Sequence, residues 1–318
     1  MDSIFVAQRR AAAALAMSRL VFKPLRLADI PLVNKYLQRS QSRACDFTIG
    51  GLYMWADYFK YEYCVVDDTL FVKGVDEANP AAVAFMVPVG SLSLGAALHL
   101  LRDYCRRRGF ALAFTAVPDY CVADLRDALG RSARVEELPG WADYVYDIDS
   151  LATLAGKSLM RKRNHVNRFL ADNPHWLFEA LTADLLPETM LFFEGLCRRD
   201  AAAASALEAY ENGRCRRVLA NLSSYPFEGA VLRGESGEIV AFALGEVVAD
   251  TLFVHVEKIN HEVSGAGAAI NKLFAAFMQR RHPSLRFVNR EEDCGDPGLR
   301  QAKESYCPLL KLRKYDVR

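Results

Sequence analysis

The residues best suited to chemistry follow a short apolar segment near the C-terminus. Residues 285–288 are predicted to form a strand, and a dense mixture of acidic, basic and turn-forming residues extends from there to Pro308. Because Gly295 and Pro297 break the strand, its carboxylates are expected at an edge of a sheet, where they can hold an ammonium group or accept a proton. An acidic turn that caps a helix is the structural alternative.

Within this segment we assign different roles to different side chains. Glu291 and Asp293 are candidate catalytic carboxylates, and Tyr306 is a further candidate catalytic residue because its hydroxyl can donate a proton. The other candidates are substrate-binding residues: Asn289, Arg300 and Lys303. Arginine suits the anionic side of a substrate because its guanidinium binds phosphate or carboxylate through two bonds.

A second polar group lies on the predicted strand 252–259. By the two-residue period of a strand, Phe253, His255 and Glu257 are predicted to share one face. Glu257 is a further candidate catalytic carboxylate. His255 is a candidate substrate-binding residue or general base, and a core histidine with satisfied hydrogen bonds is the alternative.

A predicted helix that begins near Lys157 places its basic residues on two sides. Leu159, Val166 and Leu170 form an apolar stripe at helical spacing, and Arg163 falls within that stripe. We therefore predict that Arg163 pairs with the acidic residues 291–296 or with a bound phosphate, and the alternative is that its side chain reaches the surface. The opposite face carries Lys157, Arg161, Asn164 and Arg168. Of these, Asn164 is a candidate substrate-binding residue, as is Arg163.

The elements that must position these residues alternate between strands and helices. In the first half, residues 63–75 are predicted to form a hairpin around Asp67 and Asp68, and residues 94–107 a helix that ends before Gly109. The second half repeats a similar order, with a helix at 267–281 before the strand at 285–289. We predict an N-terminal extension over residues 1–20 and domains over 21–150 and 151–318.

Composition places few limits on function. With 318 residues, 52% of them hydrophobic, and a net charge of +1, the chain has ample core material and no overall attraction to nucleic acid or membrane. The 8 cysteines are scattered, and no spacing typical of a metal site occurs, so we expect no metal. Residues 81–101 lack charge but contain Pro88 and two glycines, so they are not expected to span a membrane. A reducing cytoplasm fits best.

Three blocks of this sequence resemble the phosphatidylglycerol lysyltransferase C-terminal domain family. They are residues 47–55, 156–169 and 289–308, and the two longer blocks are the more specific. The resemblance extends from about residue 20 to residue 318. It implies an α/β (α+β) fold of two GNAT-like domains in tandem, each a mixed sheet flanked by helices. In such domains two parallel strands separate and leave a cleft, here between the strands that end at Glu257 and Asn289.

Characterised members of that family move an aminoacyl group from charged tRNA to a lipid. The resemblance thus implies an acyltransferase that uses aminoacyl-tRNA as donor and an amine or hydroxyl acceptor on a small molecule, a peptide or a lipid. The basic residues Lys157, Arg161 and Arg168 would form a local tRNA-binding patch. An acetyl-coenzyme A-dependent N-acetyltransferase and a non-catalytic small-molecule-binding protein remain as alternatives.

The turn Gly265-Ala266-Gly267 resembles the GNAT loop that holds the pyrophosphate of coenzyme A. Gly265 and Gly267 are candidate substrate-binding residues because free backbone N–H groups at a helix N-terminus bind anions, and close helix packing is the alternative. Three residues before the first glycine, where that loop usually has Gln or Arg, this chain has Glu262. Its carboxylate would repel pyrophosphate, so we expect no firm cofactor, with coenzyme A a less favoured donor than aminoacyl-tRNA.

Overall fold

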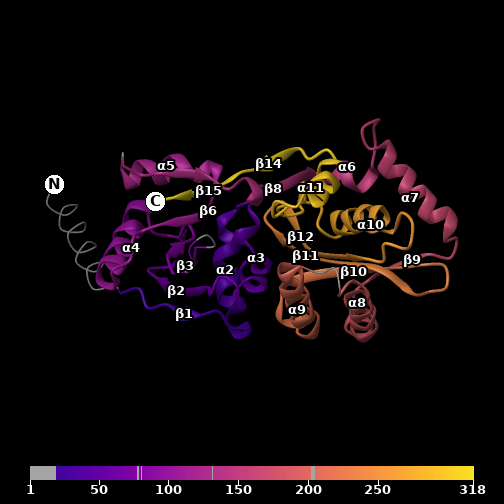
Figure 1. The fold of residues 1–318 in the computed structure, drawn as a ribbon, viewed down its shortest axis with the longest axis horizontal. Coiled ribbons are helices and arrows are strands. Elements are labelled where there is room, and N and C mark those ends of the chain that lie inside the picture. Colours follow the sequence, from indigo (N-terminus) through magenta and orange to yellow (C-terminus); the bar gives the residue numbers. More distant parts are fainter. Residues whose placement is uncertain (1–18, 77–78, 80, 131, 202–204) are drawn as a thin grey trace. The chain divides into compact units, whose positions relative to one another are not determined.

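The computed structural model describes residues 19–76, 79, 81–130, 132–201 and 205–318. The predicted N-terminal extension therefore lies outside the described residues, apart from its last two. The chain divides into two compact units (Figure 1). Unit 1 comprises residues 1–40, 56–138 and 314–318, and unit 2 comprises residues 41–55 and 139–313. The predicted boundary between residues 150 and 151 falls inside unit 2, within the helix α6 (Ile148–Thr153).

Unit 1 is built on a mixed sheet with the strand order β1-β2-β3-β4-β6-β15-β7, and β5 pairs with β3. These strands are β1 (Lys23–Pro24), β2 (Glu62–Val66), β3 (Thr69–Val75), β4 (Val83–Phe85), β5 (Val89–Gly90), β6 (Phe114–Pro118), β7 (Val135–Glu137) and β15 (Lys314–Val317). The predicted hairpin is confirmed as β2 and β3, whose turn residues Asp67 and Asp68 both have positive φ.

Among its described residues, unit 1 has the helices α2 (Ile30–Ser40), α4 (Leu94–Arg108) and α5 (Asp119–Leu129). Helix α4 ends as predicted at Gly109, which has a left-handed φ of 71° that glycine adopts without strain. Its apolar face, with Leu98 and Leu101, packs into a core that includes Phe85 and Phe114. This unit thus has its own hydrophobic core.

Unit 2 contains the second mixed sheet, in the order β14-β8-β13-β12-β11-β10-β9. Its strands are β8 (Asp143–Asp147), β9 (Leu177–Ala180), β10 (Phe227–Arg233), β11 (Ile239–Val248), β12 (Thr251–Ile259), β13 (Phe287–Asn289) and β14 (Leu310–Leu312). Its further helices are α3 (Ile49–Met54), α7 (Met160–Asp172), α8 (Leu186–Asp200), α9 (Ala206–Ala220), α10 (Ala266–Arg281) and α11 (Pro297–Glu304). Two mixed sheets with flanking helices confirm the predicted α/β class.

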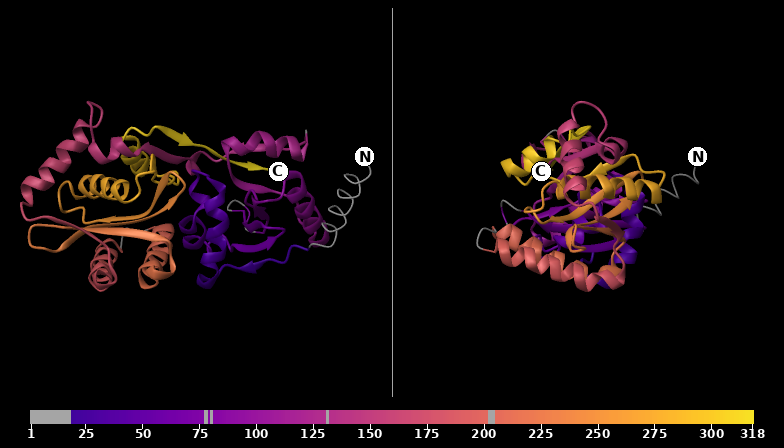
Figure 2. Two further views of the ribbon diagram at one scale, coloured as in Figure 1. Left: turned by 180° about the vertical axis from the view of Figure 1, so that it is seen from behind. Right: turned by 90° about the vertical axis from the view of Figure 1, so that its right-hand side faces the viewer.

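Helices cover both faces of the unit 2 sheet. Helix α10 packs on one face, and α8 and α9 lie on the other, as Figures 1 and 2 show from opposite sides. The main core of the unit lies under α10, where Ile270, Phe274 and Met278 meet Leu252 and Val288 of the sheet. Among the helices that the structure describes, none combines the length and apolar character needed to cross a membrane.

The sheet opens between β12 and β13, the parallel pair in unit 2. They pair only from Thr251 opposite Phe287 to Phe253 opposite Asn289, although β12 continues to Ile259. The second half of β12 and the segment after Asn289 therefore separate, as predicted for these two strands. Backbone and side chains of both segments are free to line a cavity between them.

Candidate functional site

A cavity of about 600 Å³ lies in unit 2 at this separation of β12 and β13. Its walls come from the end of α3, from α8 and α9, from the second half of β12, from the segment after β13, and from α11. Its charged lining residues are Asp200, Glu208, Glu211, Glu257, Glu291, Glu292, Lys258, Arg290 and Lys303. Six carboxylates thus face three Lys or Arg side chains, and the cavity favours a cationic ligand.

A β-bulge in β12 shapes the wall of the cavity. Leu244 pairs with Val256 and Gly245 with Val254, so His255 is an extra residue opposite the shift in register. A side chain on Gly245 would approach the Phe253 carbonyl to 2.5 Å, which explains the glycine there. The bulge reverses the alternation of β12, and the predicted common face of His255 and Glu257 is wrong.

The two faces of β12 consequently contact different helices. Glu257 lies within 3.4 Å of Asn271 of α10, whereas Lys258 forms an ion pair of 2.7 Å with Glu211 of α9. His255 lies between aromatic rings, with the centroid of Phe227 at 5.1 Å. Both His255 and Glu257 still line the cavity because it opens at the end of the strand.

His255 and Glu291 form the most buried polar contact of the cavity wall. Nδ1 of His255 lies 2.7 Å from Oε1 of Glu291, and Nε2 lies 3.5 Å from Oε1 of Glu246. Burial lowers the pKa of His255, but the two carboxylates outweigh it and raise the pKa to about 10. Burial raises the pKa of Glu291, which the neighbouring His255 opposes. We therefore assign an imidazolium to His255.

The backbone around Glu291 is held in an unusual conformation. Glu291 has a left-handed φ of 57°, which is rare for a side chain of this size. Its N–H donates to Oδ1 of Asn289 at 2.6 Å, and its carbonyl accepts from the N–H of Tyr144 at 3.1 Å. Asn289 is itself fixed, because Nδ2 donates to Oδ2 of Asp143 at 2.9 Å. Asn289 thus positions Glu291 rather than facing the cavity.

Lys303 holds the same segment from the other side. Its buried ammonium donates to the carbonyl of Arg290 at 2.6 Å and to that of Glu292, the two residues that flank Glu291. Burial lowers the pKa of Lys303, and the nearby carboxylates of Glu292 and Glu291 oppose that shift. The candidate binding residue Lys303 therefore lines the cavity while its Nζ binds main-chain oxygens.

Glu257, Arg290 and Tyr306 form a second group. Oε1 of Glu257 accepts from Nη2 of Arg290 at 3.0 Å, and the guanidinium lies 5.0 Å from the centre of the Tyr306 ring. Burial raises the pKa of Tyr306 to about 12. Glu257 and Arg290 line the cavity, and the Tyr306 ring supports Arg290 from behind.

Asp293 and Arg300 bind each other. Nε and Nη2 of Arg300 donate to the two carboxylate oxygens of Asp293 at 2.9 and 3.1 Å, and the Tyr144 hydroxyl donates to Oδ2 at 2.6 Å. Burial would raise the pKa of Asp293, but these bonds outweigh it and lower the pKa to about 2. Neither residue is among those that line the cavity.

The glycines at the start of α10 lie against helix α7. Gly265 has a φ of 80°, and a Cβ there would come within 2.2 Å of the His165 carbonyl. A Cβ on Gly267 would come within 3.1 Å of the Ile259 side chain. Close helix packing, the alternative in the sequence, accounts for Gly265, whereas Gly267 packs against strand β12. Glu262 accepts from Arg199 at 2.6 Å.

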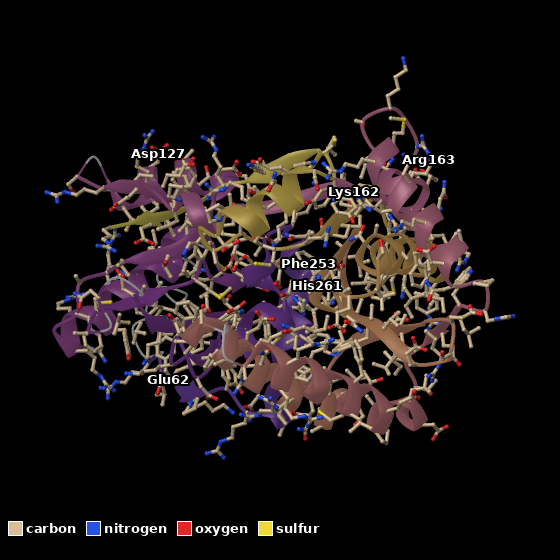
Figure 3. The ribbon with its side chains drawn as sticks, turned by 45° about the vertical axis from the view of Figure 1, so that its right-hand side comes forward. Glu62, Asp127, Lys162, Arg163, Phe253 and His261 are labelled. Atoms are coloured by element: carbon tan, nitrogen blue, oxygen red, sulfur yellow. The ribbon has the colours of Figure 1, made fainter. Side chains whose placement is uncertain are left out.

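The basic residues of helix α7 do not form ion pairs with the acidic residues 291–296 within the described part of the chain. Nη1 of Arg163 donates to the carbonyls of Leu154 at 2.6 Å and Gly156 at 3.2 Å, so its expected pairing with residues 291–296 is replaced by local main-chain bonds. Figure 3 shows Lys162 on the side of α7 toward α11, and its Nζ lies 4.2 Å from the centre of the Tyr306 ring. Asn164 is exposed, as are Lys157, Arg161 and Arg168.

The block at residues 47–55 closes the cavity through two glycines of α3. A Cβ on Gly50 would come within 2.4 Å of three atoms of the His255 ring, and a Cβ on Gly51 within 2.1 Å of the Cys45 carbonyl. The N–H of Ile49 donates to Oε1 of Glu246 at 2.7 Å. This block therefore packs directly over His255.

Sequence reasoning missed Glu246, Arg290 and Glu292. Glu246 lies in β11 among apolar residues, and a lone carboxylate in an otherwise apolar strand is a signal that could have identified it. Arg290 and Glu292 belong to the acidic segment but were not selected. Together with Glu291 they place three consecutive charged residues at the cavity.

One group has the ligand types of a metal site. Cys45, Asp46 and Asp143 offer ligand atoms within 4.8 Å of one another. However, Asp143 already accepts from the N–H of Cys45 at 2.8 Å and from Asn289 at 2.9 Å. These bonds connect the 3-10 turn Cys45–Phe47, which precedes α3, with β8 and β13, so we assign a structural role to the group.

Comparison with known proteins identifies relatives over almost the whole chain. A family model described as phosphatidylglycerol lysyltransferase, C-terminal, matches residues 37–318. A conserved protein of unknown function from Bacteroides thetaiotaomicron is 32% identical, with a TM-score of 0.85 over 93% of this chain and 98% of its own. No match was found among curated proteins.

Two further solved structures share the fold at lower identity. L-PGS from Bacillus licheniformis is 15% identical, with a TM-score of 0.64 over 94% of this chain and 93% of its own. A C-terminal domain from Agrobacterium fabrum, assigned as a lysylphosphatidylglycerol synthetase, is 15% identical, with a TM-score of 0.63 over 92% of each chain. The family match and the shared fold support a function of the acyltransferase type.

Proposed function

Because the chain belongs to the phosphatidylglycerol lysyltransferase C-terminal family, we propose that it is an aminoacyltransferase. In this proposal it moves an aminoacyl group from aminoacyl-tRNA to an amine or hydroxyl acceptor. The acceptor is a small molecule, a peptide or a lipid headgroup.

The observation that carries this proposal is the charge of the cavity. Six carboxylates, three Lys or Arg side chains and the imidazolium of His255 line a volume of about 600 Å³, so negative charge is in excess. An aminoacyl ester carries an ammonium group next to the reacting carbonyl, and buried or half-buried carboxylates bind such a group well. A donor without positive charge, such as an acetyl group, would gain nothing from this excess of negative charge.

Glu291 is the carboxylate best placed to act on the acceptor. Its side chain is 24% exposed, it lines the cavity, and His255 and Lys303 fix it from behind. The acceptor N–H or O–H would lose its proton to Glu291 as its N or O forms a bond to the ester carbonyl carbon. The bond to the ribose oxygen then breaks, and that oxygen takes up the proton.

The remaining residues would bind the two ends of the donor. Glu257 and Glu292 are cavity carboxylates within reach of an ammonium group, and Arg290 fixes the position of Glu257 through their 3.0 Å ion pair. The exposed residues Lys157 and Arg161 would contact the phosphates of the tRNA, with Arg168 on the same helix.

The proposal is tested with a panel of aminoacyl-tRNAs labelled in the amino acid. Purified full-length protein is incubated with each tRNA and with cell extract fractionated into lipids, peptides and small molecules. We expect one group of aminoacyl esters to lose label to one fraction, and a Glu291→Gln variant to lose this transfer. If no ester in the panel loses label faster than without protein, the proposal is wrong.

Calorimetry with coenzyme A tests the main alternative function, that of an acetyl-coenzyme A-dependent N-acetyltransferase. The start of α10 is packed against α7, and Glu262 adds a carboxylate there, so we expect no binding at micromolar concentrations. Micromolar binding together with acetyl transfer would favour an acetyltransferase instead.

A further inference from the structure

Two adjacent polar atoms behind the cavity wall lack a hydrogen-bond partner within the described part of the chain. They are Nε2 of His255 and Oε2 of Glu246. The His255 side chain is 0% exposed and that of Glu246 is 1% exposed, so water does not reach them. A buried polar group without a partner costs roughly 1–3 kcal/mol.

These atoms belong to a row of three titratable side chains. Glu246 lies behind His255 at 3.5 Å, and Glu291 lies in front of it at 2.7 Å, on the side of the cavity. The only member of the row with an exposed side chain surface above 1% is Glu291, at 24%. Glu291 is therefore the member of the row that presents exposed side-chain surface to a ligand in the cavity.

The slot that holds His255 is built by the fold. The bulge at Gly245 directs the ring out of the regular alternation of β12, and Gly50 of α3 leaves room for it. The Phe227 and Phe253 rings lie at 5.1 and 6.3 Å from the imidazole, and they exclude water from it. A charged imidazole in such an apolar slot needs its carboxylate partners.

We propose that Glu246, His255 and Glu291 form one proton-sharing unit, in which Glu246 is a positioning residue for Glu291. Glu246 holds the extra proton on His255, and His255 keeps Glu291 oriented and ionised toward the cavity. This inference rests on the proposed function, because it assigns to Glu291 the proton of the acceptor.

The unit returns to its starting state in each cycle. The acceptor atom forms its bond to the ester carbonyl carbon, and its proton passes to Glu291. His255 remains an imidazolium between the Glu246 carboxylate and the neutral Glu291. The bond between carbon and ribose oxygen breaks with its electron pair on oxygen, which takes the proton from Glu291. No oxidant, reductant or further reactant is needed.

Other charged groups bear on the same titration. Glu292 and Lys303 act on Glu291 with opposite signs. On the far side, Oε1 of Glu246 accepts from the neutral N–H of Ile49 of α3, and the faces toward Phe227 and Phe253 contribute no charge. Removing Glu246 thus removes one of the two carboxylates that contact the His255 ring.

The first test follows the ring nitrogens of His255 by NMR in full-length protein with labelled histidine. The signal is assigned by its loss in His255→Gln. We expect wild-type His255 to keep imidazolium shifts at pH 8, and Glu246→Gln to lower its titration midpoint by at least one pH unit. Glu211→Gln, which removes a cavity carboxylate on α9, should leave it unchanged. A neutral His255 at pH 8 in wild type, or no shift in Glu246→Gln, overturns the inference.

A second variant covers the case in which Glu246→Gln does not fold. Gly50→Ala changes no charge but places a methyl group within 2.4 Å of the His255 ring. It should displace the ring and shift the same midpoint. An unchanged titration in folded Gly50→Ala would contradict the proposed slot.

The second test measures the rate of aminoacyl transfer at a series of pH values. Glu246→Gln should lower kcat about 10- to 100-fold, as expected for a group that orients a reacting one, and should move the pH profile with KM little changed. Transfer that is unchanged in Glu246→Gln refutes the inference and leaves the proposed function intact. If no ester is a substrate, the proposed function falls, and the NMR midpoint still decides whether the three groups share a proton.

Discussion

Glu291 and Asp293 lie two residues apart in the same loop, yet the structure surrounds their carboxylates in opposite ways. Asp293 has both oxygens occupied by Arg300, Tyr144 and the N–H of Gly295, and its side chain is 4% exposed. Glu291 has one close partner, His255, and its side chain is 24% exposed toward the cavity. The first is a closed structural contact, and the second keeps an oxygen available for a ligand.

The difference shows that one acidic segment supplies both structural contacts and the candidate catalytic carboxylate. Arg300 and Asp293 tie α11 to the loop, while Lys303 of the same helix binds the carbonyls on either side of Glu291. The strained φ of Glu291 is therefore maintained by neighbours that do not touch a ligand. We expect variants of the two carboxylates to separate activity from stability.

The largest effect is expected from Glu291→Gln. Loss of the carboxylate that accepts the proton should lower the rate of aminoacyl transfer at least 100-fold, because general base catalysis typically contributes a factor of about 100 or more. The amide can still accept a bond from His255, and the Glu246 carboxylate remains beside the ring, so the variant should stay folded with a modestly lowered melting temperature. Rates from single-turnover assays and thermal melts of both proteins test this. A variant that is inactive because it is unfolded would contradict the assignment.

The general architecture of this site is predictable from the sequence. The apolar strands before Glu257 and Asn289 and the helix between them are strong local patterns, and a parallel pair that separates follows from the family resemblance. The bulge at His255 is not predictable from a period of two, because one extra residue reverses every later side chain. Gly245, which lies opposite the bulge, is the one signal of the bulge that we find in the sequence.

Contacts between distant segments were also beyond local reasoning. Helical phase placed Arg163 toward the protein, but its partners are carbonyls only seven and nine residues earlier in the chain. The pairing of Asp293 with Arg300 depends on how the chain turns between the loop that carries Asp293 and helix α11, which carries Arg300. The packing of Gly50 against His255 joins residues some 200 positions apart, which no periodicity encodes.

The next largest effect is expected from Asp293→Asn. Loss of the charge weakens bonds from the buried Tyr144 hydroxyl and the Gly295 N–H, and this should lower the free energy of unfolding by about 2 kcal/mol at pH 7. Transfer activity should fall less than tenfold. Chemical denaturation measures the change, and Glu304→Gln, in an exposed ion pair with Lys311, is the control with an expected change below about 0.5 kcal/mol.

The stability difference between wild type and Asp293→Asn should depend on pH in one direction. The folded-state pKa of Asp293 is about 2, below the value of roughly 3.9 for an unfolded aspartate. The carboxylate therefore contributes its full stability above about pH 4, and this contribution is lost as the pH falls toward 2. A difference that instead grows on acidification would mean that Asp293 is not the stabilised carboxylate.

The smallest effect is expected from Arg163→Ala, which tests a basic residue outside the cavity. Nη1 of Arg163 donates to the carbonyls of Leu154 and Gly156, and Leu154 has a left-handed φ of 55° at the end of α6. Loss of these bonds should lower the free energy of unfolding by about 1 kcal/mol.

Arg161→Ala, on the exposed side of α7, is the matched control. It should change stability by less than about 0.5 kcal/mol, because exposed side chains without such bonds contribute little. Its expected effect is on tRNA instead, where loss of one phosphate contact should make binding less dependent on salt by a slope of about 1. Chemical denaturation and filter binding at several salt concentrations measure the two effects. If Arg163→Ala weakened tRNA binding more than Arg161→Ala and left stability unchanged, Arg163 would be a tRNA-binding residue rather than a structural one.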